Sequence, residues 1–291
     1  MAPATLEDLE RFVRDHPVVD TDAALLRLFL VSTPRSPEHV LDLGAGEERV
    51  LVASVLDTMG SESAGALLLL LGFREREGSA EALGRALEAA EDLVRRGPRR
   101  RLEVPLSAAL QRHAPVLSAR GYAIAFAYYH MERPAEALPP APLPDGLRWV
   151  SASTADAEAI QALSAAAFAG VPGWYGAGVD AIRALIAEAP IPPRLVRAGD
   201  RLVACARVGL GPGGEDGLIH SIARDPTFRG QGLGVPLLAE AMRALHAEGA
   251  RRLKLDVAAV NRRAIELYLR HGFVVTSEEP TYRKSLEDGA Q

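Results

Sequence analysis

The stretch Arg229-Gly230-Gln231-Gly232-Leu233-Gly234 lies between an apolar run, Leu218 to Ala223, and a strong helix-forming segment, Pro236 to Glu248. Glycines at alternate positions leave backbone N–H groups unshielded and allow positive φ angles. A helix that begins here adds free N–H groups and the positive end of its dipole. A turn that only capped a helix would need fewer glycines and no Arg229. The stretch therefore predicts a polyphosphate-binding loop between a strand and a helix.

The composition is that of an ordinary globular protein long enough for two domains, with 291 residues, 48% hydrophobic and 24% charged. The formal net charge of −5 gives no general attraction to nucleic acid or anionic lipid, so neither is an expected partner. The single cysteine, Cys205, excludes an intramolecular disulfide and a multi-thiol metal site, and we expect no metal. Residues 1–20 lack the features of a signal peptide, and the longest apolar run, Ala64 to Leu71, is too short to span a bilayer. A cytoplasmic location is expected.

A proline-rich stretch, Pro134 to Pro144, divides the chain near its middle. Such a stretch disfavours helix and sheet and is typical of a stiff extended linker. We expect a first domain at residues 1–134, a linker at 135–145 and a second domain at 146–291.

The two halves show the same succession of elements. Residues 100–108 align without gaps with residues 251–259, and Arg120-Gly121-Tyr122 aligns with His271-Gly272-Phe273 at the same offset of 151. The shared order of helix, basic turn, strand, helix, glycine and strand predicts an internal duplication.

The second half is predicted to be an α+β domain with a mixed sheet, because hairpins and helical crossovers alternate along it. A hairpin is expected to turn at Gly199-Asp200. The expected strands are residues 147–150, 194–197, 202–209, 218–223, 253–257, 273–276 and 281–284. The expected helices are residues 155–169, 179–189, 236–248 and 261–271.

One motif in the first half imitates the nucleotide loop of S-adenosylmethionine methyltransferases. Leu41 to Gly46 reads Leu-Asp-Leu-Gly-Ala-Gly, but that motif needs a further glycine followed by a helix. Here Glu48 precedes the strand-like run Val50 to Leu56, so a hairpin fits better.

A set of residues in the second half carries a family resemblance. Arg229-x-x-Gly232-x-Gly234 follows a strand, and further residues match downstream: Leu255-Asp256-Val257, Asn261, Ala264, Leu267-Tyr268 and Gly272-Phe273. Over residues 147–284 this pattern resembles the GCN5-related N-acetyltransferases. The resemblance implies a central mixed, splayed sheet flanked by helices, acetyl-CoA as cosubstrate, a small-molecule or peptide amine as acceptor, and direct transfer without an acyl-enzyme. With the duplication, it is similar to tandem members such as mycothiol synthase.

The resemblance implies that loop amides bind the CoA diphosphate, that Arg229 adds charge, and that strand backbone pairs with the pantetheine arm. Asn261 is expected to touch the CoA arm, although it also suits a plain helix N-cap. Arg224 replaces a small aliphatic residue of the family, and its side chain either reaches a CoA phosphate or leaves the sheet for solvent. The expected cofactor contacts are Ile222, Ala223, Arg224, Arg229, Gly230, Gln231, Gly232, Leu233, Gly234, Asn261 and Tyr268.

By resemblance, Tyr268 is the general acid that protonates the departing CoA thiolate, although its spacing also fits a core aromatic. A phenol remains protonated at neutral pH, so its proton is available.

The base is less fixed in the family, and His220 is the candidate. It should share a strand face with Ile222 and Arg224, and imidazole titrates near neutral pH. A satisfied histidine within the sheet is the alternative. Glu215 and Asp216 are reserve bases acting through water, and Asp256 could serve but is expected to anchor the loop that follows.

The acceptor pocket is expected around Phe168 to Tyr175, with Trp174 and Tyr175 as candidate contacts, although these aromatics also suit simple packing. Two further functions stay open: a non-catalytic CoA-responsive binding protein, and an acyltransferase that uses a longer acyl-CoA. A monomer is expected, with a homodimer as the alternative.

The first half is expected to be a degenerate copy without cofactor. Leu110 and Leu117 stand where the second half has Asn261 and Tyr268. Its loop, Arg76 to Glu81, keeps one glycine and places carboxylates where phosphates would bind, which would repel CoA. We expect this half to wall the acceptor pocket.

Overall fold

The computed structural model describes residues 5–18, 39–44, 46–58, 65–136, 139–174, 176–211 and 213–286. These residues form two compact units. Unit 1 contains the described chain up to Tyr128 together with the residues from Glu278 onward, and unit 2 contains Tyr129–Ser277. Among the described helices, none combines the length and the apolar character needed to cross a membrane.

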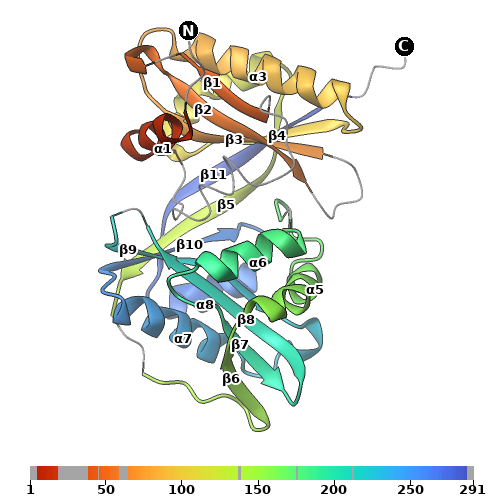
Figure 1. Ribbon diagram of the computed structural model, residues 1–291, viewed down its shortest axis with the longest axis vertical. Helices are drawn as coiled ribbons and strands as arrows, with labels where there is room; N and C mark the ends of the chain where they lie inside the picture. The colour runs from red at the N-terminus through yellow and green to blue at the C-terminus, as the bar shows by residue number, and fades with distance from the viewer. Residues whose placement is uncertain are drawn as a thin grey trace. The chain divides into compact units, whose positions relative to one another are not determined.

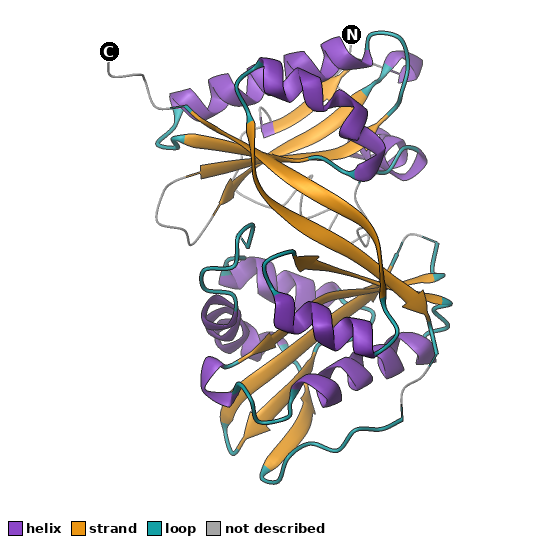
Figure 2. Ribbon diagram, turned by 180° about the vertical axis from the view of Figure 1, so that it is seen from behind, coloured by secondary structure: helices purple, strands orange, loops and turns teal. Residues whose placement is uncertain are grey.

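The boundaries of these units differ from the expected division at residues 135–145. Strand β5 (Ala123–Pro134) begins in unit 1 and ends in unit 2, whereas β11 (Val274–Ser285) begins in unit 2 and ends in unit 1. Figure 2 shows these as the two longest strands, lying side by side. The two strands expected at 273–276 and 281–284 are thus one strand. Each unit is completed by a strand end from the other half of the chain.

Unit 1 is built on strands in the order β1-β2-β3-β4-β11. Only β3 and β4 are parallel, and β1 and β2 form the antiparallel hairpin predicted in place of a methyltransferase loop. Every residue of β3 is buried. The elements before β5 are α1 (Leu6–Asp15), β1 (Val40–Leu43), η2 (Gly46–Glu48), β2 (Leu51–Thr58), β3 (Gly65–Phe73), α3 (Ser79–Arg96), β4 (Arg101–Pro105), η3 (Ala108–His113) and α4 (Ala114–Ala119).

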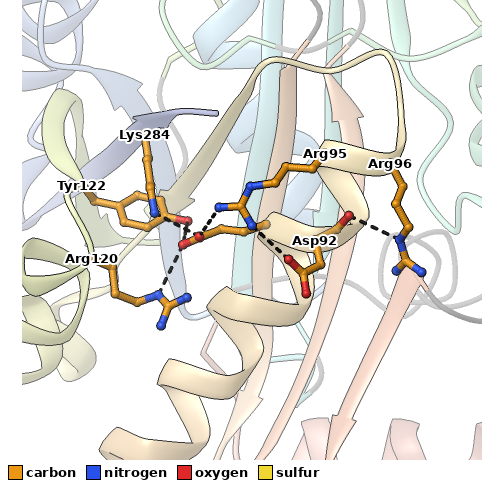
Figure 3. Close-up of polar contacts among 7 residues, drawn as sticks. Asp92, Arg95, Arg96, Arg120, Tyr122 and Lys284 are labelled. Carbon is orange, nitrogen blue, oxygen red and sulfur yellow. Dashed lines mark hydrogen bonds and ion pairs between the residues drawn. The ribbon is translucent and has the colours of Figure 1, made fainter. Parts of the chain in front are cut away.

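A buried carboxylate fastens the end of β11 within unit 1. Glu91 of α3 is 2% exposed and pairs with Lys284 at 2.9 Å, Arg95 at 3.0 Å and Arg120 at 3.3 Å. Figure 3 shows these cations converging with Tyr122 on one carboxylate. Burial alone would raise the pKa of Glu91, but hydrogen bonds from Lys284 and Arg120 outweigh it and lower that pKa. Glu91 therefore remains charged at neutral pH.

Unit 2 has the strand order β6-β7-β8-β9-β10-β5, with β9 and β10 parallel and the pairs from β6 to β9 antiparallel. Its elements, labelled in Figure 1, are β6 (Leu147–Ser151), η4 (Thr154–Asp156), α5 (Ala157–Ala167), α6 (Val179–Glu188), β7 (Arg194–Ala198), β8 (Arg201–Leu210), β9 (Asp216–Arg224), η5 (Pro226–Phe228), α7 (Gly234–Ala247), β10 (Arg252–Ala258) and α8 (Arg262–Arg270). This mixed sheet with helices confirms the predicted α+β class.

Helices cover both faces of the unit 2 sheet because its central strands are apolar on both sides. Leu237 and Met242 of α7 pack with Ala206 of β8 in one core. Leu163 of α5 packs with Cys205, the residue before Ala206 in β8, in a second core on the opposite face. A site in this sheet can therefore open only where strands separate or end.

The duplication is visible in the strands. Strand β9 begins and ends 151 residues after β3 begins and ends, and β11 stands in the same relation to β5. This is the offset that aligns the two sequences. In unit 1, β3 runs parallel to β4, which follows α3. In unit 2, β9 likewise runs parallel to β10, which follows α7. The chain is a tandem protein, as its sequence predicts.

Candidate active site

Two parallel strands separate in the middle of unit 2. Pairing of β9 with β10 ends at Ile219 and Leu255, although β9 continues to Arg224 and β10 to Ala258. We call this opening the fork. Beyond it, residues 221–224 remain paired on the β8 side, while the other edge of residues 220–224 is released from β10. An extended ligand with amide groups could pair with that edge as an added strand does.

A β-bulge at His220 accompanies the fork. The pairing of β8 with β9 passes from Ser221 to Ile219 and skips His220. Bulges bend a strand and increase its twist, which directs β9 away from β10. Ile219 and Ile222 consequently contact the same core. The expectation that His220 shares a face with Ile222 and Arg224 assumed strict alternation, which this bulge interrupts.

The glycine loop joins β9 to α7. Gly230 and Gly232 have φ angles of 80° and 78°, and no atom lies within 4 Å of the position that a Cβ would take at either. Leu233 is fully buried and anchors the loop, while the Gln231 amide nitrogen donates to the Thr227 carbonyl at 3.0 Å. Helix α7 begins at Gly234 rather than at Pro236, so its first N–H groups open onto the loop. An anion can approach this backbone closely.

Three arginines, Arg224, Arg229 and Arg263, bring positive charge to the glycine loop. Nη1 of Arg224 lies 4.0 Å from the position that a Cβ of Gly234 would take, so its side chain turns toward the loop. Burial, and then the charges of Arg229 and Arg263, lower the pKa of Arg224. Nε of Arg224 is buried without a hydrogen-bond partner, and within the described residues none of the three forms an ion pair. This concentration of positive charge favours a polyanion.

Helix α8 brings Asn261 and Tyr268 to the same region. Leu267 of α8 lies 3.3 Å from where a Cβ of Gly234 would be, so α8 packs against the start of α7. Asn261 caps α8, its Oδ1 accepting the Ala264 N–H at 3.3 Å. The Tyr268 ring packs on Phe273 with 5.9 Å between centroids. Burial raises the pKa of Tyr268 to about 12, so the phenol holds its proton throughout the neutral range.

The reserve bases are engaged in ion pairs. Asp216 receives Lys254 Nζ at 2.9 Å and Arg252 Nη2 at 2.8 Å. Burial alone would raise the pKa of Asp216, but these hydrogen bonds outweigh it and lower that pKa. Glu215 pairs with Arg251 at 3.2 Å on the surface. A carboxylate with a lowered pKa is a weak base, so Asp216 is poorly suited to accept a proton.

Asp256 pairs with a residue that the sequence did not suggest. Its Oδ1 lies 2.5 Å from Nδ1 of His130 in β5, so Asp256 holds another strand rather than only the following loop. His130 lies in the first half of the sequence, where no local motif surrounds it. Only the exchange of β5 into unit 2 brings it here.

The aromatic segment expected to contact the acceptor follows α5. Trp174 stacks on Phe168 with 5.9 Å between ring centroids, whereas Tyr175 lies outside the described residues. Arg229 donates to the carbonyl of Ala167 at 3.4 Å, which connects the end of α5 with the glycine loop. Ala223 is 1% exposed and packs in the core beneath α5, so its side chain does not face a ligand. Across the described residues, no group of three histidine, cysteine or carboxylate side chains could hold a metal.

The corresponding edge of unit 1 is filled by the chain itself. Leu71 to Phe73 align with Ile222 to Arg224 at the offset of 151. The Val18 N–H donates to the Leu71 carbonyl at 3.1 Å, and the Phe73 N–H donates to the His16 carbonyl at 3.0 Å. The segment after α1 thus lies along this edge as an added strand would.

The loop of unit 1 also differs from the glycine loop of unit 2. The Arg76 N–H donates to Oγ of Ser79 at 2.8 Å, so this amide is satisfied within the loop. Leu110 and Leu117 are 3% and 0% exposed, and neither can donate or accept a proton. At these two positions unit 1 therefore lacks the polar side chains that Asn261 and Tyr268 provide in unit 2.

Comparison with known proteins agrees with this geometry. Residues 167–273 match the acetyltransferase (GNAT) family. A mycothiol acetyltransferase from Catenulispora acidiphila is 30% identical over 256 residues, which cover 80% of each protein. A tandem GNAT protein from the clavulanic acid biosynthesis pathway has a TM-score of 0.68 at 16% identity, over 97% of this chain and 94% of that one. A GCN5-related N-acetyltransferase from Sphaerobacter thermophilus has a TM-score of 0.66 at 20% identity, over 94% and 88%.

Proposed function

Because this chain belongs to the GCN5-related N-acetyltransferase family as a tandem member, and is an acyltransferase, we propose that unit 2 transfers the acetyl group of acetyl-CoA directly to an amine. The acceptor is a small molecule or a peptide. The fork carries this proposal, because it joins an open strand edge to the glycine loop and its three arginines. A thioester on an amide-bearing arm that ends in a diphosphate matches these features in order.

The residues at the fork suit the cofactor in both shape and charge. The released edge of residues 220–224 offers backbone groups to the two amides of pantetheine. The loop amides and the start of α7 receive the diphosphate, with Arg224 and Arg229 adding charge-assisted contacts. Asn261 borders the arm from the start of α8.

The chemistry then needs a polarised carbonyl, a base and an acid. A backbone N–H of Ile222 or Arg224 polarises the thioester carbonyl. The neutral amine attacks the carbonyl carbon, the C–N bond forms and the C–S bond breaks with its electron pair on sulfur. Tyr268 donates its proton to that sulfur, and the nitrogen loses the proton that balances this transfer. His220 at the bulge, or a water molecule, is the base that the sequence predicts.

Unit 1 is proposed to bind no cofactor. His16 and Val18 take the backbone partners that pantetheine would need on β3. A Cβ at Gly72 would lie 3.1 Å from Phe12, so α1 packs directly over this strand. We expect one CoA per chain in calorimetry, and two would contradict the proposal.

Two glycine variants test the proposal with matched backbone strain. Gly232 in the loop and Gly199 in the β7–β8 hairpin both have positive φ and open space around a Cβ. Gly232→Glu should abolish CoA binding by charge repulsion, whereas Gly199→Glu should leave it intact. Thiol release from acetyl-CoA is then followed with a panel of amines headed by the acceptor of mycothiol acetyltransferases.

The panel also separates the alternatives. Comparison of acetyl-CoA with longer acyl-CoA donors identifies the acyl group. CoA binding without thioester consumption by any amine would refute catalysis and favour a CoA-responsive binding protein. Equal binding by wild type and Gly232→Glu would refute the assigned site.

A further inference from the structure

His130 and Asp256 lie on the sheet face opposite the α7 core of unit 2. Met131 of β5 and Leu255 of β10 are buried in that core. Because side chains alternate along a strand, their neighbours His130 and Asp256 point to the other face. This is also the face on which α5 packs over the neighbouring strands, through Ala223 of β9.

Asp256 stands on the β10 arm of the fork, and His130 lies on β5, the next strand of the sheet. Asp256 follows Leu255, the last residue of β10 that pairs with β9, just as His220 follows Ile219. Neighbouring strands lie about 4.8 Å apart where pairing ends, so Asp256 starts beside the bulge. The side chains of His130 and Asp256 are 29% and 57% exposed, so a substrate can reach them.

Four other charged residues of β5, β9 and β10 form ion pairs with one another. Lys254 contacts Asp216 at 2.9 Å and Glu132 at 3.9 Å, and Arg252 contacts the same two carboxylates. Arg252 and Lys254 thus share Asp216 and Glu132 as ion-pair partners. Asp256 pairs with His130 at 2.5 Å, in the geometry by which a carboxylate orients an imidazole and stabilises its charged form.

We propose that His130, oriented by Asp256, is the general base of the acetyl transfer, in place of His220. This inference rests on the function proposed for unit 2. The acceptor enters as an ammonium ion, and the His130 imidazole accepts one proton from its nitrogen and passes it to solvent. The neutral nitrogen attacks the thioester, Tyr268 protonates the sulfur, and the second nitrogen proton returns through solvent to Tyr268. The sum is amide, thiol and one released proton.

Two amines of similar shape test this base in the full-length protein. Ethylamine is protonated at neutral pH, whereas trifluoroethylamine is largely neutral and needs no base before attack. His130→Gln and Asp256→Asn should lower kcat/KM for ethylamine by about 100-fold or more, the usual contribution of a general base. For trifluoroethylamine, kcat/KM should fall by no more than about tenfold in the same variants. The pH profile of kcat/KM for ethylamine should lose the limb that reports deprotonation of this base.

Glu132→Gln is the matched control, because it removes a carboxylate of β5 that also contacts β10 but leaves His130 with Asp256. It should change neither amine's rate by more than a few-fold. A loss of the same size in Glu132→Gln, or equal losses for both amines in His130→Gln, would show that the pair only holds the strands together. The same selective loss in His220→Gln, with His130→Gln active, would return the role to His220. Wild type that releases thiol with neither amine nor any member of the panel would refute the proposed function itself.

Discussion

Replacement of Tyr268 by Phe should remove the proton donor and little else. The ring packs on Phe273 at 5.9 Å and on the core with α7, contacts that a phenylalanine retains. Among the described residues, the Tyr268 hydroxyl has no hydrogen-bond partner whose loss would destabilise the fold. The free energy of unfolding should therefore change by less than about 1 kcal/mol. Tyr282→Phe, in the core of unit 1, is the matched control.

The rate should respond far more than the stability. Loss of a general acid lowers kcat by about 10²- to 10⁴-fold, which corresponds to about 3–5 kcal/mol in the barrier. Burial raises the pKa of Tyr268 to about 12, so wild type should show no alkaline fall from this group below about pH 11. Thiol release from acetyl-CoA gives kcat, and calorimetry gives the CoA Kd, which should change less than twofold. A Tyr268→Phe variant with kcat within tenfold of wild type, or with CoA affinity lost in parallel, would refute the assignment.

Three further perturbations test other parts of the structure. Arg224→Met should weaken CoA binding by about 1–3 kcal/mol and flatten its salt dependence in calorimetry, because a charge-assisted contact is lost; unchanged affinity would place Arg224 outside the site. Residues 146–291 expressed alone should show neither the cooperative thermal unfolding transition nor the CoA binding of the full chain, because unit 2 then lacks residues 129–134. A stable fragment that binds CoA would contradict this. Glu91→Gln should lower the free energy of unfolding by about 3 kcal/mol at neutral pH, because three cations lose their partner. The pKa of Glu91 is lowered in the fold, so its contribution is present above its unfolded pKa of about 4.5 and is lost as pH falls below that; thermal melts with a constant difference between wild type and variant through about pH 3 would contradict this sign.

The parts of the fold that the sequence predicts are those encoded by neighbouring residues. Alternate glycines after an apolar run predict a loop and a helix, and both occur around Gly232. Asn261 followed by an amphipathic segment predicts a capped helix, and its side chain accepts the Ala264 N–H as expected. Such features depend on local backbone chemistry, which spacing reveals.

The features that the sequence did not predict depend on partners far away in the chain. The apolar pattern of β9 gives no sign that β8 skips His220, because a bulge is fixed by the pairing of two strands. The pattern around Tyr129 and Met131 predicts a strand but not its neighbour, so His130 could not be placed beside Asp256. Proline content suggested a boundary at residues 135–145, yet Ala135 is buried in the core of unit 2. A strand edge is chemically the same whichever segment completes it, so composition alone cannot locate the exchange.

The same property of strand edges explains how one copy of a duplicated fold can lose its ligand and remain folded. An unpaired edge exposes N–H and C=O groups that need partners wherever water is excluded. In unit 2 the edge beyond the fork is suited to a bound arm, whereas in unit 1 His16 and Val18 supply the hydrogen bonds from within the chain. With that edge satisfied, Leu117 can replace the polar residue of the other copy and add to the buried core. The N-terminal segment thus gives this edge of unit 1 its backbone partners without a ligand, and for this reason we propose the chemistry at the fork of unit 2 alone.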